Sequence, residues 1–112
     1  MKIATPVDAA GQSAHAWGRA HWVAVAEVKD AAIEGWQVHE VSWDVLHDST
    51  THGSHHARVV TFLKDHGIQA IVVDHVGEGM QRMLSTMGIP LLPASPGDAQ
   101  ASVLAAVRGA TS

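Results

Sequence analysis

The stretch Ala70–Gly88, A-I-V-V-D-H-V-G-E-G-M-Q-R-M-L-S-T-M-G, decides how this chain folds. Its first four residues form an unbroken apolar run, which is typical of a strand covered on both faces, as in a parallel sheet. Gly88 stands where helices commonly end in a left-handed cap. Between them, two glycines flank Glu78, and apolar residues recur at the spacing of one helix face: Met80, Met83, Leu84 and Met87. The stretch therefore predicts a strand, a Gly-rich turn and a helix.

The Gly-rich turn is a candidate ligand site because of its place in the predicted sheet. Open α/β sheets bind ligands beyond the carboxyl ends of their strands. The start of the following helix also offers backbone N–H groups to an anion. Helix–strand packing needs glycine at such a turn as well, so the glycines alone do not decide between the two roles.

Three strands are predicted before this stretch, and no helical pattern separates them. Apolar, β-branched and aromatic residues mark these strands as Lys2–Val7, His21–Val28 and Gly35–Trp43. A loop of small and polar residues joins the first two. The segment Lys29–Glu34 is expected to form a longer hairpin connection between the second and the third. The three strands should therefore form an antiparallel meander.

Helices alternate with strands in the rest of the chain. The polar segment Leu46–Gly53 is expected to be irregular, and a helix follows over Ser54–His66. A short strand is predicted over Ile89–Leu92. The last helix is expected to take Ser95 as its N-cap and to end at Gly109.

The resulting order, βββαβαβα, describes one α/β domain over residues 1–112, with a mixed five-stranded sheet and three helices. Right-handed crossovers place the helices on the faces of the sheet. By fold analogy this is the ribonuclease H-like arrangement, in which the first and fourth strands lie side by side and parallel.

Composition excludes several classes of site. Eleven acidic residues outnumber seven basic ones, and without a Lys/Arg cluster we expect no nucleic-acid surface. The absence of cysteine excludes disulfides, Cys–zinc sites and thiolate-held iron–sulfur clusters within this chain. No apolar run approaches the roughly 20 residues of a membrane span, and no signal-peptide core is visible, so we expect a cytoplasmic protein. The chain is rich in histidine, with nine, and histidine is the commonest metal-binding side chain.

Two groups of side chains could carry chemistry. If the first and fourth strands are neighbours, Asp8 and Asp74 end at one edge of the sheet, beside the loop that carries His15. The alternative is a purely structural role, in which these acids cap loops and Glu78 favours a helix start. The second group is H-x-x-H-H, and two imidazoles one helical turn apart can hold a divalent metal or can simply be solvated: His52, His55 and His56.

The chain resembles the dinitrogenase iron–molybdenum cofactor family, which includes NifX-like proteins, in the order and spacing of its motifs. These motifs are M-K-I-A-T-P-V-D, a loop with W-G-R-A, a meander, then I-V-V-D-H-V-G-E-G-M and L-S-T-M-G-I-P. The resemblance covers Met1 to about Arg108. It implies the ribonuclease H-like fold and a non-enzymatic domain, with no catalytic residues, that carries an iron–sulfur or iron–molybdenum cluster.

The resemblance also implies which residues bind the cofactor. The family's first loop usually reads His-Phe-Gly-Arg-Ala; here residues 17–20 match its last four positions with Trp17 replacing Phe, Ala16 takes the usual His place, and His15 lies one residue earlier. Glu78 stands in the turn where the family usually has an uncharged or basic residue, and a carboxylate there would repel an anionic cluster by about 1 kcal/mol or more. The implied cofactor site comprises His15, Trp17, Gly18, Arg19, Gly77, Glu78, Gly79 and Met80.

Three functions stay open from the sequence. The first is a carrier of a metal–sulfur cluster or a His-bound divalent metal, loaded or unloaded by a donor or acceptor protein and itself a monomer or weak homodimer. The second is a cofactor-free interaction or regulatory domain on the same fold. The third is a Mg²⁺-dependent phosphoryl-transfer enzyme using Asp8 and Asp74, for which the first helix offers no third acid near the site.

Overall fold

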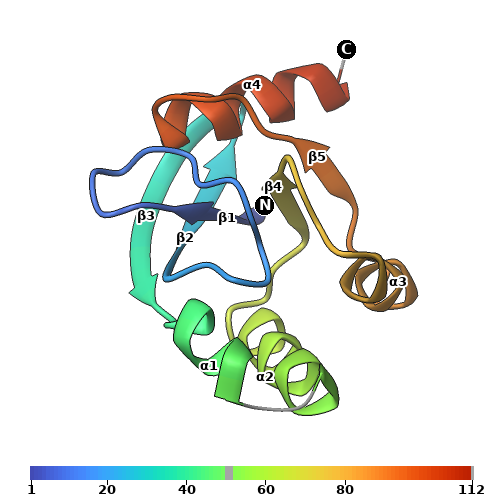
Figure 1. Ribbon diagram of the computed structural model, residues 1–112. Coiled ribbons are helices and arrows are strands. Elements are labelled where there is room, and N and C mark those ends of the chain that lie inside the picture. Colours follow the sequence, from blue (N-terminus) through green and yellow to red (C-terminus); the bar gives the residue numbers. More distant parts are fainter. Residues whose placement is uncertain (50–51, 112) are drawn as a thin grey trace.

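A computed structural model describes residues 1–49 and 52–111 of the chain, without the side chains of residues 47–53 and 111. The described residues form an α/β fold whose five strands share one mixed sheet, with helices on both sides of it (Figure 1). The elements are β1 (Lys2–Val7), β2 (Trp22–Lys29), β3 (Ala32–Glu40), α1 (Trp43–Ser49), α2 (His52–Asp65), β4 (Ala70–Val73), α3 (Glu78–Thr86), β5 (Leu91–Pro93) and α4 (Ala99–Thr111).

The strand order of the sheet is β3-β2-β1-β4-β5. β1 and β2 are antiparallel, as are β2 and β3, so the predicted meander is confirmed. β1 also pairs with β4 in parallel, with Ile3 opposite Ala70 and Ala4 opposite Ile71. The prediction that the first and fourth strands are parallel neighbours is therefore confirmed as well. Because of this pairing, the segments that follow β1 and β4 leave the sheet at the same edge.

The central strands are covered on both faces, which explains the unbroken apolar run of β4. Successive strand residues point to opposite faces. Ile71 and Val73 join the core beneath α2 and α3, whereas Ala70 and Val72 join the core beneath α4. Figure 1 shows α4 on one side of the sheet and the other three helices on the opposite side.

The β2–β3 hairpin corrects two expectations. Its connection is a tight turn rather than a long loop over Lys29–Glu34, because Asp30 and Ala31 take left-handed backbone angles, with φ of 53° and 61°. Two-residue hairpin turns need this conformation. β3 also ends at Glu40 rather than at Trp43, because Ser42 turns the chain with a φ of 53°.

The helices correct the predicted order βββαβαβα to βββααβαβα. Trp43 does not end a strand but opens an additional helix, α1, which occupies part of the segment expected to be irregular; residues 50–51 lie outside the described part. α2 begins at His52 rather than at Ser54. β5 spans Leu91–Pro93 rather than Ile89–Leu92. None of the helices in the described part of the chain combines the length and the apolar character that a membrane span needs.

The last helix also differs at both ends. α4 begins at Ala99, because Gly97 has a φ of 102° that no helix accepts. The N-cap side chain is therefore Asp98 rather than Ser95, and its Oδ2 accepts the Ala101 N–H at 2.9 Å. The helix continues through Gly109 to Thr111 instead of ending at the glycine.

Candidate functional site

The segments after β1 and β4 meet in space and form a cavity of about 290 Å³. Ala16 pairs with His75 as an isolated parallel bridge, and the Trp17 N–H donates to the His75 carbonyl at 3.5 Å. α3 closes one side with its first turn, and α2 contributes two histidines. The cavity is lined by Ala16, Trp17, Gly18, Arg19, His55, His56, His75, Gly77, Glu78, Gly79 and Met80.

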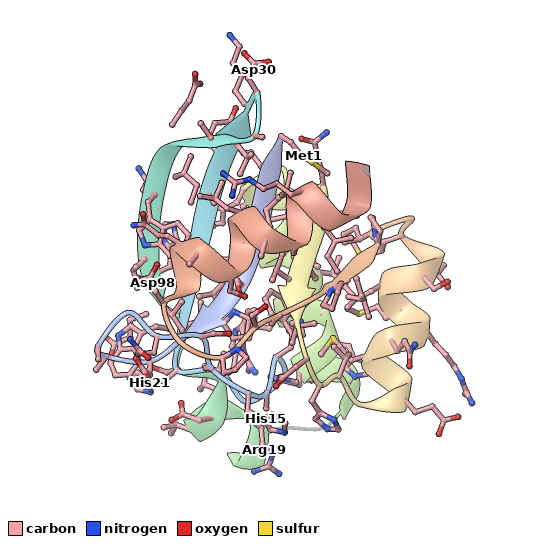
Figure 2. All side chains as sticks on the ribbon, turned by 90° about the horizontal axis from the view of Figure 1, so that it is seen from above. Met1, His15, Arg19, His21, Asp30 and Asp98 are labelled. Carbon is pink, nitrogen blue, oxygen red and sulfur yellow. The ribbon has the colours of Figure 1, made fainter. Side chains whose placement is uncertain are left out.

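The cavity therefore contains seven of the eight residues that the sequence analysis assigned to a cofactor. The eighth, His15, lies on the rim with a side chain that is 76% exposed. Its Nδ1 is 3.0 Å from Asp74 Oδ2, and its ring stacks on His75 at a centroid distance of 5.4 Å and an interplanar angle of 6°. Figure 2 shows His15 and Arg19 at the end of the molecule opposite Asp30.

Trp17 is the largest fully buried side chain in the lining. Its ring meets the edge of Trp43 at a centroid distance of 5.1 Å and an angle of 72°, so the first residue of α1 supports it from behind. The Trp17 Nε1 atom is buried and has no hydrogen-bond partner. A buried N–H without an acceptor costs about 1–3 kcal/mol, and a small movement of the lining would let this indole donate to a molecule bound in the cavity.

The first turn of α3 approaches α2 closely because residue 79 is glycine. A Cβ added to Gly79 would lie 3.3 Å from Cε1 of His56, tighter than ordinary van der Waals contact. The helix has no side-chain N-cap, and its first N–H bonded to a carbonyl one turn back is that of Gln81, which donates to the Gly77 carbonyl. The backbone N–H groups of residues 78–80 therefore have no acceptor within the helix. They lie at the positive end of its dipole.

His55 links the first loop to α2. Its side chain is buried, and its Nε2–H donates to the Gly18 carbonyl at 2.7 Å while Arg58 Nη1 lies 3.2 Å from its Nδ1. A carbonyl can only accept, so Nε2 carries the proton and Nδ1 is the acceptor for Arg58. With both nitrogens engaged, the ring keeps no lone pair for a metal in this arrangement, and it acts as a strut under Gly18.

Glu78 does not direct a lone charge at the cavity. Its carboxylate accepts from Arg82 Nη2 at 2.6 Å, one turn along α3, and the side chain is 80% exposed. Solvent and the guanidinium both weaken its repulsion of an anion. The cost that the sequence analysis assigned to Glu78 is correspondingly smaller.

The acidic residues do not gather into one site. Asp8 Oδ1 accepts the N–H groups of Ala10 and Gln12, each at 2.9 Å, so Asp8 closes its own turn. Asp74 pairs with His15 at the rim. Among the described residues there is no group of three or more His, Asp or Glu side chains arranged to hold a metal ion. The side chain of His52, the third member of H-x-x-H-H, lies outside the described part of the chain.

His75 is one of two lining residues, with Ala16, that were not predicted as site residues. It directly follows Asp74 at the carboxyl end of β4, and its carbonyl holds the Trp17 N–H. Its position was the available signal, because the first residues beyond a central parallel strand commonly face the ligand.

Comparisons with known proteins agree with the fold. A family model described as dinitrogenase iron–molybdenum cofactor matches residues 1–109. The chain is similar in structure to a candidate dinitrogenase from Methanocaldococcus jannaschii, with 15% identity and a TM-score of 0.72 over 97% of this chain and 89% of that one. It is also similar to a candidate NifB protein from Thermotoga, with 16% identity and a TM-score of 0.73 over 96% and 88%. A search of the curated proteins found no match.

Proposed function

Because the chain belongs to the dinitrogenase iron–molybdenum cofactor family, we propose that it is a non-enzymatic carrier of a preassembled metal–sulfur cluster, held in the cavity between the first loop and α3. The observation that supports this most directly is the buried Trp17 indole N–H without a partner, in the lining of that cavity. We further propose that the domain acts in the cytoplasm and exchanges its cargo with a donor or acceptor protein, as a monomer or weak homodimer.

The donor set favours a cluster over a single metal ion. A bare divalent ion needs three or four protein ligands, and the described residues offer no such group. A preassembled cluster that brings all of its ligands, bridging sulfide and terminal thiolate alike, is an anion, so the protein has only to hold an anion. The cavity offers donors for that purpose: the N–H groups at the start of α3 and the Trp17 indole.

Weak attachment also suits a carrier, because the cargo must leave again. Hydrogen bonds to an anion exchange without breaking a covalent or coordinate bond. His75 lines the same cavity and would replace one terminal thiolate of the cargo, so that release breaks a single coordinate bond. The strand order β3-β2-β1-β4-β5 supports the further proposal that this scaffold is ribonuclease H-like.

The test is anaerobic loading of the purified, untagged protein with a synthetic [4Fe–4S] cluster that carries its own small-thiolate ligands. We expect about one cluster per chain by iron and sulfide analysis, with a visible absorption band. Trp17→Phe removes the unpaired donor, and a hydrogen bond to a charged group contributes about 1.5–3 kcal/mol, so the affinity should fall about 10–100-fold. Trp36→Phe is the control, since it makes the same change in the core on the α4 side of the sheet, away from the cavity.

Two results would contradict the carrier. One is protein that takes up neither cluster nor metal in any amount near one per chain. The other is an equal loss of affinity in the two tryptophan variants, which would show that the indole N–H does not meet the cargo. The absence of a three-ligand group among the described residues also favours a second candidate, a cofactor-free interaction domain, and protein that stays metal-free after loading would support it.

A further inference from the structure

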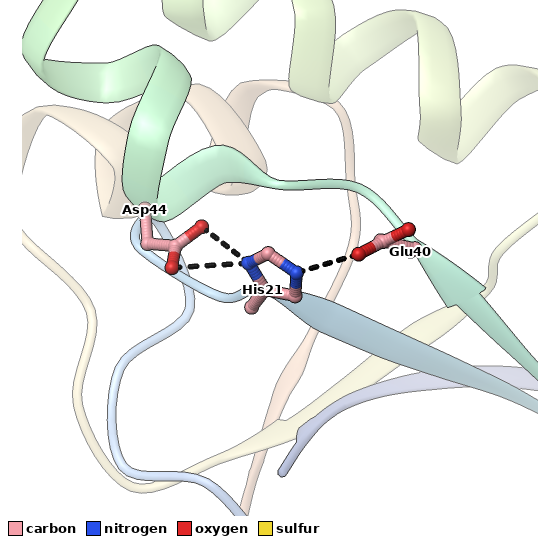
Figure 3. Close-up of polar contacts among 3 residues, drawn as sticks. All are labelled: His21, Glu40 and Asp44. Carbon is pink, nitrogen blue, oxygen red and sulfur yellow. Dashed lines mark hydrogen bonds and ion pairs between the residues drawn. The ribbon is translucent and has the colours of Figure 1, made fainter. Parts of the chain in front are cut away.

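His21 lies between two carboxylates, just before β2 begins. Its Nδ1 is 2.9 Å from Asp44 Oδ1 and 3.1 Å from Oδ2, and its Nε2 is 2.7 Å from Glu40 Oε2 (Figure 3). Ionised carboxylates only accept hydrogen bonds, so both ring nitrogens must donate. The geometry therefore describes an imidazolium cation bonded on both sides.

The two carboxylates come from different elements that meet at one corner. Glu40 is the last residue of β3, and Asp44 lies in the first turn of α1. The backbone of the same histidine holds the connection between them, since its carbonyl accepts the N–H groups of Val41 and Ser42 at 2.9 and 3.0 Å. His21 thus fastens the β3–α1 corner with its main chain and its side chain together.

α1 depends on such anchors because it is only seven residues long. A helix of that length is not stable by itself in water, so its position must come from tertiary contacts. Its first residue, Trp43, is buried against Trp17 and also meets the His55 ring edge-on, at a centroid distance of 6.2 Å. Both partners line the cavity, so a shift of α1 would move the side chains that support it.

We propose that protonated His21, bridging Glu40 and Asp44, is a positioning residue that holds α1 in place and thereby sets the Trp43–Trp17 pair behind the cavity. The proposal goes beyond cluster carriage, because it concerns the protein without cargo. Its consequence is that the packing of the cavity depends on pH. A ligand that needs the Trp17 indole would then be held more firmly when His21 carries its proton.

The direction of the pH dependence follows from the partners. Hydrogen bonds to Asp44 and then to Glu40 raise the pKa of His21 above its ordinary value of 6.5, and the bond to His21 lowers the pKa of Asp44 below 3.8. These two carboxylates, from α1 and β3, are the charges that raise the pKa of His21. The uncharged Trp22 ring from β2 packs edge-to-face with the His21 ring at a centroid distance of 4.2 Å. The bridge is fully formed between the ordinary pKa values of Asp and His. It is lost as pH rises through the raised pKa of His21, or falls through the lowered pKa of Asp44.

The experiment is an NMR titration of the cargo-free protein from pH 5 to pH 10. It follows the His21 ring and the indole N–H signals of Trp17 and Trp43, which single Trp→Phe variants assign. We expect the His21 midpoint above 6.5 and movement of both indole signals with that same midpoint. Asp44→Asn should lower the His21 midpoint, whereas Asp65→Asn, an exposed acid at the end of α2, should leave it unchanged.

Two outcomes would overturn the proposal: a His21 midpoint at or below 6.5, or indole signals that stay fixed while His21 titrates. If Asp44→Asn fails to fold, the titration of the unaltered protein still decides the question. Since no cluster is present in these measurements, failure here leaves cluster carriage untouched. Failure of cluster loading would likewise leave the His21 bridge standing.

Discussion

Replacing Thr5 with valine tests whether the β1–β4 seam holds the two halves of the site together. Thr5 is fully buried between these strands, and its hydroxyl donates to the Val72 carbonyl at 2.8 Å. Valine has nearly the same shape, so the substitution removes the hydrogen bond without opening a cavity. The site depends on this seam, because the parallel pairing of β1 with β4 brings the segments after both strands to one edge.

The expected cost follows from burial. An intramolecular hydrogen bond contributes about 0.5–1.5 kcal/mol net, and leaving the Val72 carbonyl short of a partner in a dry environment adds to the loss, so we expect about 1–2 kcal/mol. Unfolding entropy is about 2.1 cal/mol/K per residue, or about 0.24 kcal/mol/K for 112 residues. The midpoint of thermal unfolding should therefore fall by about 4–8 °C.

Thr61→Val is the matched control. Thr61 also donates its hydroxyl to a backbone carbonyl, that of Ala57 at 3.0 Å, but it lies exposed on α2, where water replaces the lost bond. We expect a change within about 0.5 kcal/mol, since threonine and valine have similar helix propensities. Both variants are compared by urea and thermal unfolding. Equal losses in the two variants, or a gain of stability in Thr5→Val, would refute the reasoning from burial.

Three further predictions concern other parts of the chain. His55→Phe keeps an aromatic ring in place but removes the hydrogen bonds to Gly18 and Arg58, so it should lower the free energy of unfolding in urea by about 1–2 kcal/mol. It should also speed amide exchange in the first loop, and unchanged exchange there would contradict the role of His55 in supporting that loop. Asp98→Ala removes the cap of α4 and should cost about 1 kcal/mol, with Asp98→Asn close to neutral as its control. Gly109→Ala should stabilise the protein by about 0.5–1 kcal/mol, because α4 continues through an open position there; a loss would place a helix end at Gly109 instead.

Local sequence patterns were sufficient to predict the limits of the two central strands, which are buried on both faces. β1 and β4 have the limits that the sequence predicts, because every residue of Ala70–Val73 is buried and the apolar run has no ambiguity. The same pattern failed at β3, where the series of Trp and Val residues suggested a strand as far as Trp43. The strand stops earlier because Ser42 adopts a left-handed backbone, and a serine at that position carries no clear sign of it.

The candidate site shows the same division. Motif order and the pairing of the first and fourth strands located the cavity, and seven of its eleven lining residues were anticipated as cofactor residues. The roles of individual side chains were not accessible in this way. Spacing suggests metal binding for His55, whereas the position of the Gly18 carbonyl makes it a strut; composition makes Glu78 a repulsive charge, whereas Arg82 pairs with it.

The sequence by itself determined the α/β class, the meander, the central strand and the edge of the sheet where the cavity lies. These features follow from periodicity and chain order, because the alternation of apolar and polar residues along a segment indicates whether one face or both faces of it are buried. Only the tertiary structure decided that α1 exists, that the Trp17 indole N–H is unpaired, and that His21 joins Glu40 to Asp44. The reason is that hydrogen-bond partners and burial depend on which residues from distant segments come within about 3 Å, and no local pattern records that distance.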